Sequence, residues 1–307
     1  MLSLIIVLFS FMASAHQYTH DNLGGYVCSE EQCGFKQVIT FQNPIISSND
    51  ETLILNRLEV MNQTLSKKFI VPSSLTIGSS ILSEYNAFYN PPDSFLGEGL
   101  AFGAAFILSN PTTVLLPTLT HEYGHALFEK NVIEGLYRQL GFSYSLSIDE
   151  KKKLFRQLSG PMNELYADVI SHLFDGNKLS EAFREVSEFA KDDESLLKKD
   201  RKKIEKAFTK DILECRDYEG QNSRLKPFYL FARKTHLETH LILCPSANYV
   251  WNKLQSEPTN NGKIERMHKA FSAYLAEAMK NPETIKNKLK RKHNWNQELI
   301  DFLEVHL

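Results

Sequence analysis

The chain of 307 residues is long enough to bury a sizeable core and to form one large or two modest domains. Hydrophobic residues make up 42% of the sequence and charged residues 23%, which is ordinary for a globular protein and excludes a largely disordered chain. The formal net charge of -2 gives no global reason to expect a nucleic acid or an acidic lipid as a partner.

The first fifteen residues have most features of an export signal. An apolar run at 4–12 is much shorter than the roughly 20 residues that span a bilayer, and the small residues at 13–15 fit a signal-peptidase site. The start lacks the usual Lys or Arg, and a buried strand or an uncleaved anchor is the alternative. We expect residues 1–15 to be a signal peptide, a mature chain that starts at His16, and a secreted or periplasmic location.

Four cysteines follow this segment. Cys28 and Cys33 lie near the mature N-terminus, at a spacing that closes a small disulfide loop in an oxidising compartment. Cys215 and Cys244 could pair with each other or remain buried thiols, and the sequence does not decide between the two.

Residues 16–116 read mostly as short strands and turns. Segments rich in β-branched or aromatic residues and broken by Pro, Gly and Asn predict strands at 37–41, 69–72, 74–77 and 104–109. Leucines and a methionine at helical spacing predict one helix at 53–67. We therefore expect a strand-rich N-terminal lobe.

Helical patterns dominate after Pro117. We expect helices at 118–131 and 162–174, the second ended by the Asp-Gly pair at 175–176, because Gly suits a helix C-cap. Residues 177–307 are mostly helical and highly charged, with helix starts marked by Pro227, Pro245, Pro258 and Pro282. The charge-dense stretches at 191–206 and 286–292 are interpreted as solvated helix faces, with a patch that binds nucleic acid or membrane as the less favoured alternative. The predicted fold class is α+β, with a central helix pair at 117–176 and a helical C-terminal lobe at 177–307.

The sequence His-Glu-x-x-His at 121–125 offers a metal-binding pair. On a helix, His121 and His125 project from one face, where two imidazoles can bind one zinc ion at about 2.0–2.1 Å. Glu122 is rotated by about 100° and lies beside the metal, where a carboxylate can act as general base. The alternative is that both histidines are ordinary polar residues of an amphipathic helix, because the short motif alone is only moderately specific.

A second helix supplies the missing ligand. Glu164 and Asp168 are four residues apart on one helical face, and a catalytic zinc needs three protein ligands and an open position. Glu164 fits the role of the third ligand. Asp168 fits the role of a carboxylate that accepts a hydrogen bond from the ring nitrogen of a ligand histidine that does not bind the metal. A solvated Glu–Asp pair is the alternative, but the flanking residues are apolar and predict a buried helix: Leu165, Ala167, Val169, Ile170 and Leu173.

The two motifs together resemble those of the gluzincin metallopeptidases. The Asn-Glu-x-x-x-Asp pattern at 163–168 is most similar to the corresponding helix of thermolysin-like enzymes. The metzincin pattern fails, because Phe128 and Asn131 occupy the positions of its Gly and third His. The gap between the motifs is longer than in thermolysin, and we expect 129–159 to form an inserted helical excursion.

The resemblance implies one catalytic Zn²⁺ held by His121, His125 and Glu164. It implies Glu122 as the general base and Asp168 as the residue that orients a ligand histidine. It covers only two short segments of the chain.

The resemblance also implies a Tyr or His from the C-terminal part that stabilises the oxyanion of the tetrahedral intermediate. The candidates are His236, His240, Tyr229 and Tyr249. We select His240 because an apolar stretch follows it, although a buried core histidine is the alternative. His172 continues the stripe of Glu164 and Asp168 and could orient a ligand or replace one.

Thermolysin-like enzymes bind the substrate as an added strand along the edge of their sheet. We expect 104–109 to be the strand that forms this edge, or simply a core strand. An endopeptidase is favoured over an aminopeptidase, because the Gly-x-Met-Glu-Asn motif of aminopeptidase relatives is absent and 97–100 is a poor substitute. Intramembrane prenyl-protein proteases share a similar Glu-x-x-x-Asp element, but they need several membrane spans. None is expected in this chain after residue 15.

The sequence thus predicts a zinc metallopeptidase whose partner is a protein or peptide substrate, without nucleic acid or a stable membrane span once the signal is removed. Two alternatives remain: an exported zinc-binding pseudoenzyme, and an exported interaction protein in which both motifs are accidental. The presence of Glu122 speaks against a pseudoenzyme, because a structural metal site needs no base.

Overall fold

The computed structural model describes residues 15–19, 27–29, 32–34, 38–42, 46–79, 85–92, 97–142, 150–192, 243–283 and 295–307, and the structural statements below concern these residues. The strands are β1 (Ala15–Thr19), β2 (Val27–Ser29), β3 (Gln32–Gly34), β4 (Val38–Gln42), β5 (Ser74–Ser79), β6 (Ala87–Asn90) and β7 (Gly99–Phe102). The helices are α2 (Ser48–Leu65), α3 (Ala104–Ile107), η1 (Pro111–Leu115), α4 (Leu116–Phe128), η2 (Glu129–Ile133), α5 (Glu134–Leu140), α6 (Glu150–Asp175), α7 (Lys178–Asp192), α11 (Cys244–Leu254), α12 (Asn260–Lys280) and α14 (Trp295–His306).

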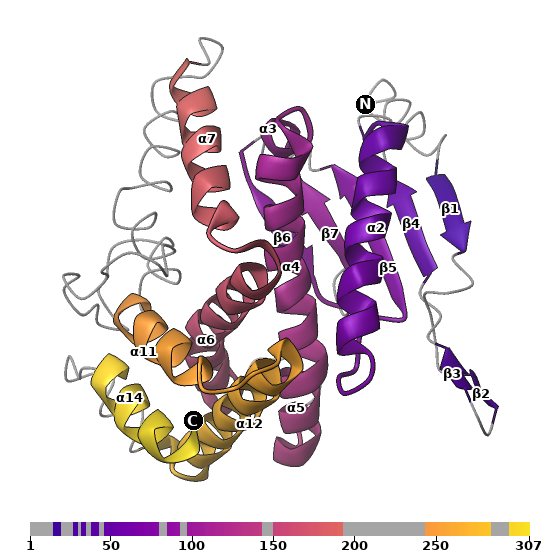
Figure 1. The fold of residues 1–307 in the computed structure, drawn as a ribbon. Helices are drawn as coiled ribbons and strands as arrows, with labels where there is room; N and C mark the ends of the chain where they lie inside the picture. Colours follow the sequence, from indigo (N-terminus) through magenta and orange to yellow (C-terminus); the bar gives the residue numbers. More distant parts are fainter. Residues whose placement is uncertain are drawn as a thin grey trace, which may run out of the picture.

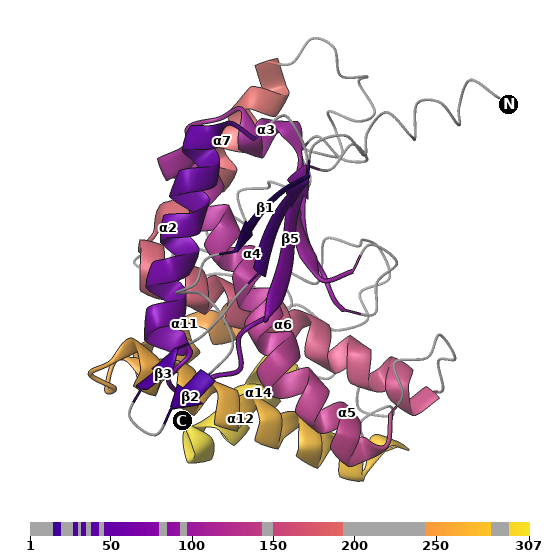
Figure 2. The ribbon, with the colours of Figure 1, turned by 90° about the vertical axis from the view of Figure 1, so that its right-hand side faces the viewer.

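The strands form one mixed sheet and one separate hairpin. The sheet has the order β1-β4-β5-β7-β6, in which β4, β5 and β7 run parallel while β1 and β6 run antiparallel to their neighbours. Parallel neighbours need a long crossover, and α2 supplies the one between β4 and β5. Helices α2 and α4 lie on the same face of this sheet (Figures 1 and 2).

Alternation along the strands explains that layer. Leu75 and Ile77 of β5 are fully buried, while the residues between and before them are half-buried or exposed. Helix α2 begins at a serine cap, Ser47, whose hydroxyl accepts a hydrogen bond from the Asp50 amide. Its apolar stripe, which includes Ile54 and Leu58, covers the sheet.

The helix predicted at 118–131 is confirmed, although it is divided differently. It begins as η1 and α4, passes through the π-helical turn η2 and continues as α5 to Gly141, which has a left-handed φ of 69°. Together with the start of α6, η2 and α5 account for the described part of the predicted helical excursion at 129–159.

The helix predicted at 162–174 starts earlier than expected. Helix α6 begins at Glu150 and passes through Pro161, where the missing N–H costs one backbone hydrogen bond. Leu154, Phe155 and Leu158, all before the proline, are buried and favour continuation through burial of their side chains. The end is as predicted, at Asp175, with Gly176 at a φ of 64°.

Two predicted strands are wrong. Residues 69–72 are not in a strand, because the side chain of Asn131 accepts a hydrogen bond from the Ile70 amide and donates one to the Ile70 carbonyl, in place of a neighbouring strand. Residues 104–107 form α3, which is capped by the extended Gly103, and Leu108 returns a hydrogen bond to the Ala104 carbonyl. The predictions of strands at 37–41 and 74–77 and of a helix at 53–67 are confirmed as β4, β5 and α2.

The chain is mixed α and β, but it does not divide into the predicted lobes. Buried apolar side chains form one continuous cluster that extends from Ile39 in β4 to Leu307 after α14. Helices α4 and α6 lie at its centre, α11 and α12 pack against α6, and α14 packs against α11 and α12 (Figure 1). Helix α11 begins at Cys244, one residue before the predicted proline start, Pro245.

No helix of the described segments is long and apolar enough to cross a membrane. Apart from Ala15 in β1, the predicted signal peptide lies outside the described residues. Cys215, His236, His240 and Tyr229 also lie outside them, as do most of the two charge-dense stretches.

Candidate metal centre

Helix α4 carries polar side chains into the core. All thirteen of its residues are buried, and these include His121, Glu122 and His125. The hydroxyls of Thr118 and Thr120 donate hydrogen bonds back to carbonyls of the preceding turn. Burying imidazole and carboxylate groups is costly unless they have strong partners, so the arrangement requires compensation from the neighbouring helix.

That neighbour is α6, which packs directly against α4. A Cβ atom added to Gly124 would lie 2.7 Å from the Ala167 Cα, closer than real Cβ contacts allow. The Ser171 hydroxyl also donates a hydrogen bond of 3.1 Å to the Pro117 carbonyl. The small residues therefore bring the two backbones close enough for short side chains of both helices to share one site.

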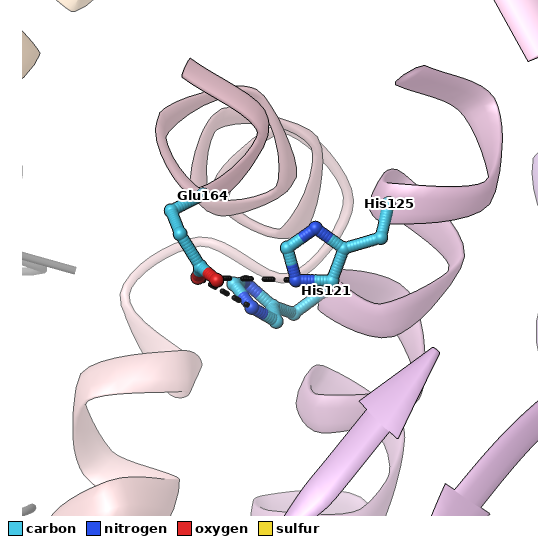
Figure 3. Close-up of side chains that lie close together, drawn as sticks. All are labelled: His121, His125 and Glu164. Atoms are coloured by element: carbon cyan, nitrogen blue, oxygen red, sulfur yellow. Dashed lines mark ion pairs between the residues drawn. The ribbon is translucent and has the colours of Figure 1, made fainter. Parts of the chain in front are cut away.

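His121, His125 and Glu164 converge at this crossing. One ligand atom from each lies within 4.8 Å of the other two, and Figure 3 shows the three side chains pointing toward one another. The Glu164 Oε2 atom lies 3.6 Å from His121 Nε2 and 3.8 Å from His125 Nε2. Two ligands of one tetrahedral zinc ion, each at about 2.0–2.1 Å, are about 3.3 Å apart, so small side-chain movements suffice for a metal ion.

The outer nitrogens of both histidines are held by α6. His121 Nδ1 lies 2.9 Å from Asp168 Oδ1, and His125 Nδ1 lies 2.9 Å from Asn163 Oδ1. An acceptor at Nδ1 fixes the proton there and leaves the Nε2 lone pair directed at the shared position, the arrangement usual for metal-bound histidines. The donor set thus fits a metal ion, and the structure bears out the predicted grouping of His121, His125 and Glu164.

Glu122 lies beside the group without belonging to it. Its Oε2 atom is 3.9 Å from His125 Nε2, and its side chain is buried. A carboxylate at this position can exchange a proton with a water molecule at the metal position. Asp168, predicted to orient a histidine, is placed against His121 as expected.

Among the described residues of α6 near the site, two are partly exposed to solvent. From Pro161 to Ser171, Asn163 and Glu164 are the two half-buried residues, whereas the others are buried. Glu164, the candidate third ligand, and Asn163, whose side chain contacts His125, therefore border the solvent.

A second polar cluster ties the sheet to the end of the metal-binding helix. The Tyr89 hydroxyl donates to Glu98 at 2.9 Å, and Lys130 Nζ lies 3.2 Å from Glu98 and 2.8 Å from Glu134. Burial raises the pKa of Glu98 despite the opposing effect of Lys130. Burial alone would lower the pKa of Lys130. The hydrogen bonds and negative charges of Glu134 and Glu98 outweigh burial and raise this pKa above its ordinary value. This Tyr89–Glu98–Lys130–Glu134 cluster holds β6 against η2.

The other predicted site residues lie elsewhere. The ring of His172 packs edge-on against Trp251, with ring centroids 4.3 Å apart, and His172 is not in the metal-binding group. Tyr249 lies on α11 with Lys253 over its ring. Asn163 has a role that sequence reasoning missed, and the available signal was its place on the helix beside Glu164.

No protein-family model, curated protein or solved structure matches the chain. The geometry of this site is therefore the basis for its proposed chemistry.

Proposed function

We propose that the chain is a zinc-dependent metallopeptidase. The observation that carries the proposal is the convergence of two imidazole nitrogens and one carboxylate, within 4.8 Å of one another, beside a second carboxylate, that of Glu122. Two histidines and one glutamate are a known catalytic zinc set, which leaves a position open for water and substrate. A purely structural zinc site would be closed by a fourth ligand.

A zinc ion in this site would supply the Lewis acid that polarises the scissile carbonyl and acidifies the attacking water. Glu122 accepts a proton from that water and delivers it to the leaving amine. Asp168 and Asn163 hold the proton on the outer nitrogens of His121 and His125, so that both rings keep their orientation. His240 remains the proposed oxyanion-stabilising group.

Strand β6 replaces 104–109 as the proposed substrate-binding edge. Within the described residues it pairs with β7 on one side only, and it packs against α4. The open side of an edge strand offers backbone N–H and C=O groups to an extended peptide. A substrate added there runs past the end of the metal-binding helix.

The Tyr89–Glu98–Lys130–Glu134 cluster supports an endopeptidase. An aminopeptidase needs a carboxylate that binds the substrate amine. The obvious candidate, Glu98, already accepts from Tyr89 and pairs with Lys130. The proposed substrate is therefore an internal segment of a protein or peptide.

Export remains part of the proposal. Strands β2 and β3 place Cys28 directly opposite Cys33 in an antiparallel pair, where Cα atoms are about 4.5–5.5 Å apart and within the range of a disulfide. We expect native protein to start at His16 with these two cysteines oxidised. N-terminal sequencing and thiol alkylation of native material test both points, and a chain with free thiols that still starts at Met1 would contradict them.

Peptide cleavage at matched zinc content tests the proposed reaction. Glu122→Gln keeps the size of the side chain but cannot accept a proton, so it should retain zinc and lose about 10²–10⁴-fold in rate. His125→Ala should lose both the zinc and the activity. Equal rates for wild type and Glu122→Gln would exclude Glu122 as the base, and zinc binding without any cleavage by wild type would favour the pseudoenzyme.

A further inference from the structure

A cavity of about 290 Å³ lies next to the metal centre, between the α4–η2–α5 helical run and the first half of α6. Asn163 belongs to both the cavity and the metal centre, because its side-chain oxygen contacts His125 Nδ1 while the residue also lines the cavity. Phe128, one turn after His125, lines it as well. Pro91, which follows β6, completes the wall on the side of the sheet edge.

The half-buried Asn163 therefore lies at the border between the cavity and the metal group. A peptide laid along β6 passes Pro91, and each residue of an extended chain advances by about 3.3–3.6 Å. A side chain within a residue or two of the scissile bond can enter the cavity. Its volume lies at the lower end of the range for ligand pockets, about 300–1,000 Å³, which suits one side chain and not a larger ligand.

Two rigid aromatic residues form part of the wall. The Tyr137 ring is held edge-on by Phe142 and Phe155, with ring centroids 5.5 and 5.4 Å away. The Phe128 ring packs edge-on against Tyr166 at 5.3 Å. Because the rings behind them fix both side chains, the cavity keeps its shape without a ligand. Phe128 is fully buried, and an aromatic guest that reaches the Tyr137 ring gains a ring–ring contact beyond simple burial.

The polar lining favours a guest without charge. Glu129 and Arg156, of opposite sign, both border the cavity, and Arg156 Nε donates to the Tyr137 hydroxyl at 3.3 Å. Ser159 and Asn163 add a hydroxyl and an amide that suit a phenol group. Gly160 leaves part of the α6 wall without a side chain.

We infer that this cavity is a specificity subsite for one uncharged aromatic side chain, Tyr or Phe, of the peptide substrate, adjacent to the scissile bond. The inference rests on the proposed function in taking the ligand to be a peptide. It assigns substrate choice to residues that line the cavity and are not themselves metal ligands.

Binding without cleavage tests the subsite by itself. Zinc-loaded Glu122→Gln is titrated with Ala-rich hexapeptides in which one position is Ala, Leu, Phe, Tyr, Lys or Glu. The Phe and Tyr peptides should bind about 10–200-fold more tightly than the Ala peptide at one position, the range for filling a matched apolar pocket. Equal affinities across the series would overturn the subsite.

Filling the cavity should remove that preference. Gly160→Leu, added to Glu122→Gln, should bring the aromatic peptides to the affinity of the Ala peptide. The control is Gly135→Leu on α5, an exposed helical glycine whose added Cβ would meet nothing within 4 Å. Pro91→Trp fills the cavity from the strand side and replaces Gly160→Leu if that variant fails to fold. Persistence of the preference in a folded filled variant would overturn the proposal.

Cleavage by the protein with Glu122 intact separates this proposal from the proposed reaction. No cleavage of any peptide, with the aromatic preference retained in binding, would overturn the reaction and support the subsite. Cleavage of all peptides at one rate, with no preference in binding, would overturn the subsite and support the reaction.

Discussion

At the scale of single residues, the metal centre depends on groups that do not touch the metal position. Asp168 Oδ1 contacts His121 Nδ1 at 2.9 Å, and Asp168→Asn replaces a charged acceptor by a neutral amide. Loss of such a partner typically costs 10–100-fold in metal affinity, and we expect a change of about this size. Zinc titration against a chromophoric chelator measures it. Asp192→Asn, an exposed change at the end of α7, is the control and should leave the affinity unchanged.

Sequence reasoning found most of this centre because helical spacing carries the information. Residues four apart share a face, so the pairs His121–His125 and Glu164–Asp168 could be predicted before their helices were placed. Asn163 escaped because it lies one residue before Glu164, outside that spacing. Its contact with His125 depends on how α6 crosses α4, which only tertiary packing fixes.

At the scale of elements, the crossing of α4 and α6 depends on Gly124. Because a Cβ there would lie 2.7 Å from Ala167 Cα, Gly124→Ala should push the helices apart and destabilise the fold by about 1–3 kcal/mol. It should also weaken metal binding, since the ligands come from both helices. Urea unfolding and zinc titration measure the two effects.

Gly135→Ala gives the matched comparison, because its added Cβ meets nothing within 4 Å. The same change should stabilise α5 by about 0.5–1 kcal/mol, through the higher helix propensity of Ala. Equal effects of Gly124→Ala and Gly135→Ala would contradict close packing at the crossing.

The π-helical turn η2 is linked to α12 by His268, whose Nε2 donates to the Asn131 carbonyl. Burial lowers the pKa of His268 below its ordinary value of 6.5, although the bond to Asn131 opposes the shift. The native state therefore binds fewer protons than the unfolded state, so this contribution to stability is complete above about pH 6.5 and is lost as the pH falls through the lowered pKa. Three other groups surround the His268 ring. The charge of Lys269 lowers its pKa, the charge of Glu265 raises it, and the Phe69 ring packs against it.

We expect the free energy of unfolding to be lower at pH 5 than at pH 7.5, by less than about 1.4 kcal/mol per unit of pKa shift for this group. His268→Gln keeps a donor and removes the titration, so its pH dependence should be smaller. Urea unfolding of both proteins with a chelator present keeps metal binding out of the comparison. Identical pH profiles would show that His268 does not contribute.

The elements that sequence patterns misassigned were decided by partners distant in the chain. Residues 69–72 looked like a strand because they are apolar and β-branched. Their backbone is instead satisfied at Ile70 by the Asn131 side chain, which lies 61 residues later. Residues 104–109 have a strand-like composition, but four of them close into α3 after Gly103. Local propensity cannot anticipate either outcome.

At the scale of the whole molecule, one core joins the sheet to the described helices, including α4 and α6, which carry the candidate metal centre. The predicted class was right because periodicity separates strands from helices. The predicted lobes were wrong because side chains of α4 and α6 pack in the same cluster as those of β5 and α12. Which apolar faces meet is a property of tertiary packing that no window of sequence contains.

This coupling predicts that metal stabilises the folded state. Zinc in thousand-fold excess over its Kd should add about 4 kcal/mol to the free energy of unfolding, and chelation should remove that contribution. The midpoint of thermal unfolding should fall by several degrees on chelation. The midpoint of thermal unfolding of His125→Ala should be the same with and without the chelator. A wild-type midpoint that does not respond to zinc would argue against a metal bound to the native state.

Anomalous diffraction from zinc-loaded crystals at the zinc absorption edge tests the metal centre most directly. The account predicts one strong peak at the crossing of α4 and α6, about 2.0–2.2 Å from His121 Nε2, His125 Nε2 and a Glu164 carboxylate oxygen, with Glu122 near but not bound. A peak held by Glu122 or Asp168 instead of Glu164, or no peak at this crossing, would contradict it.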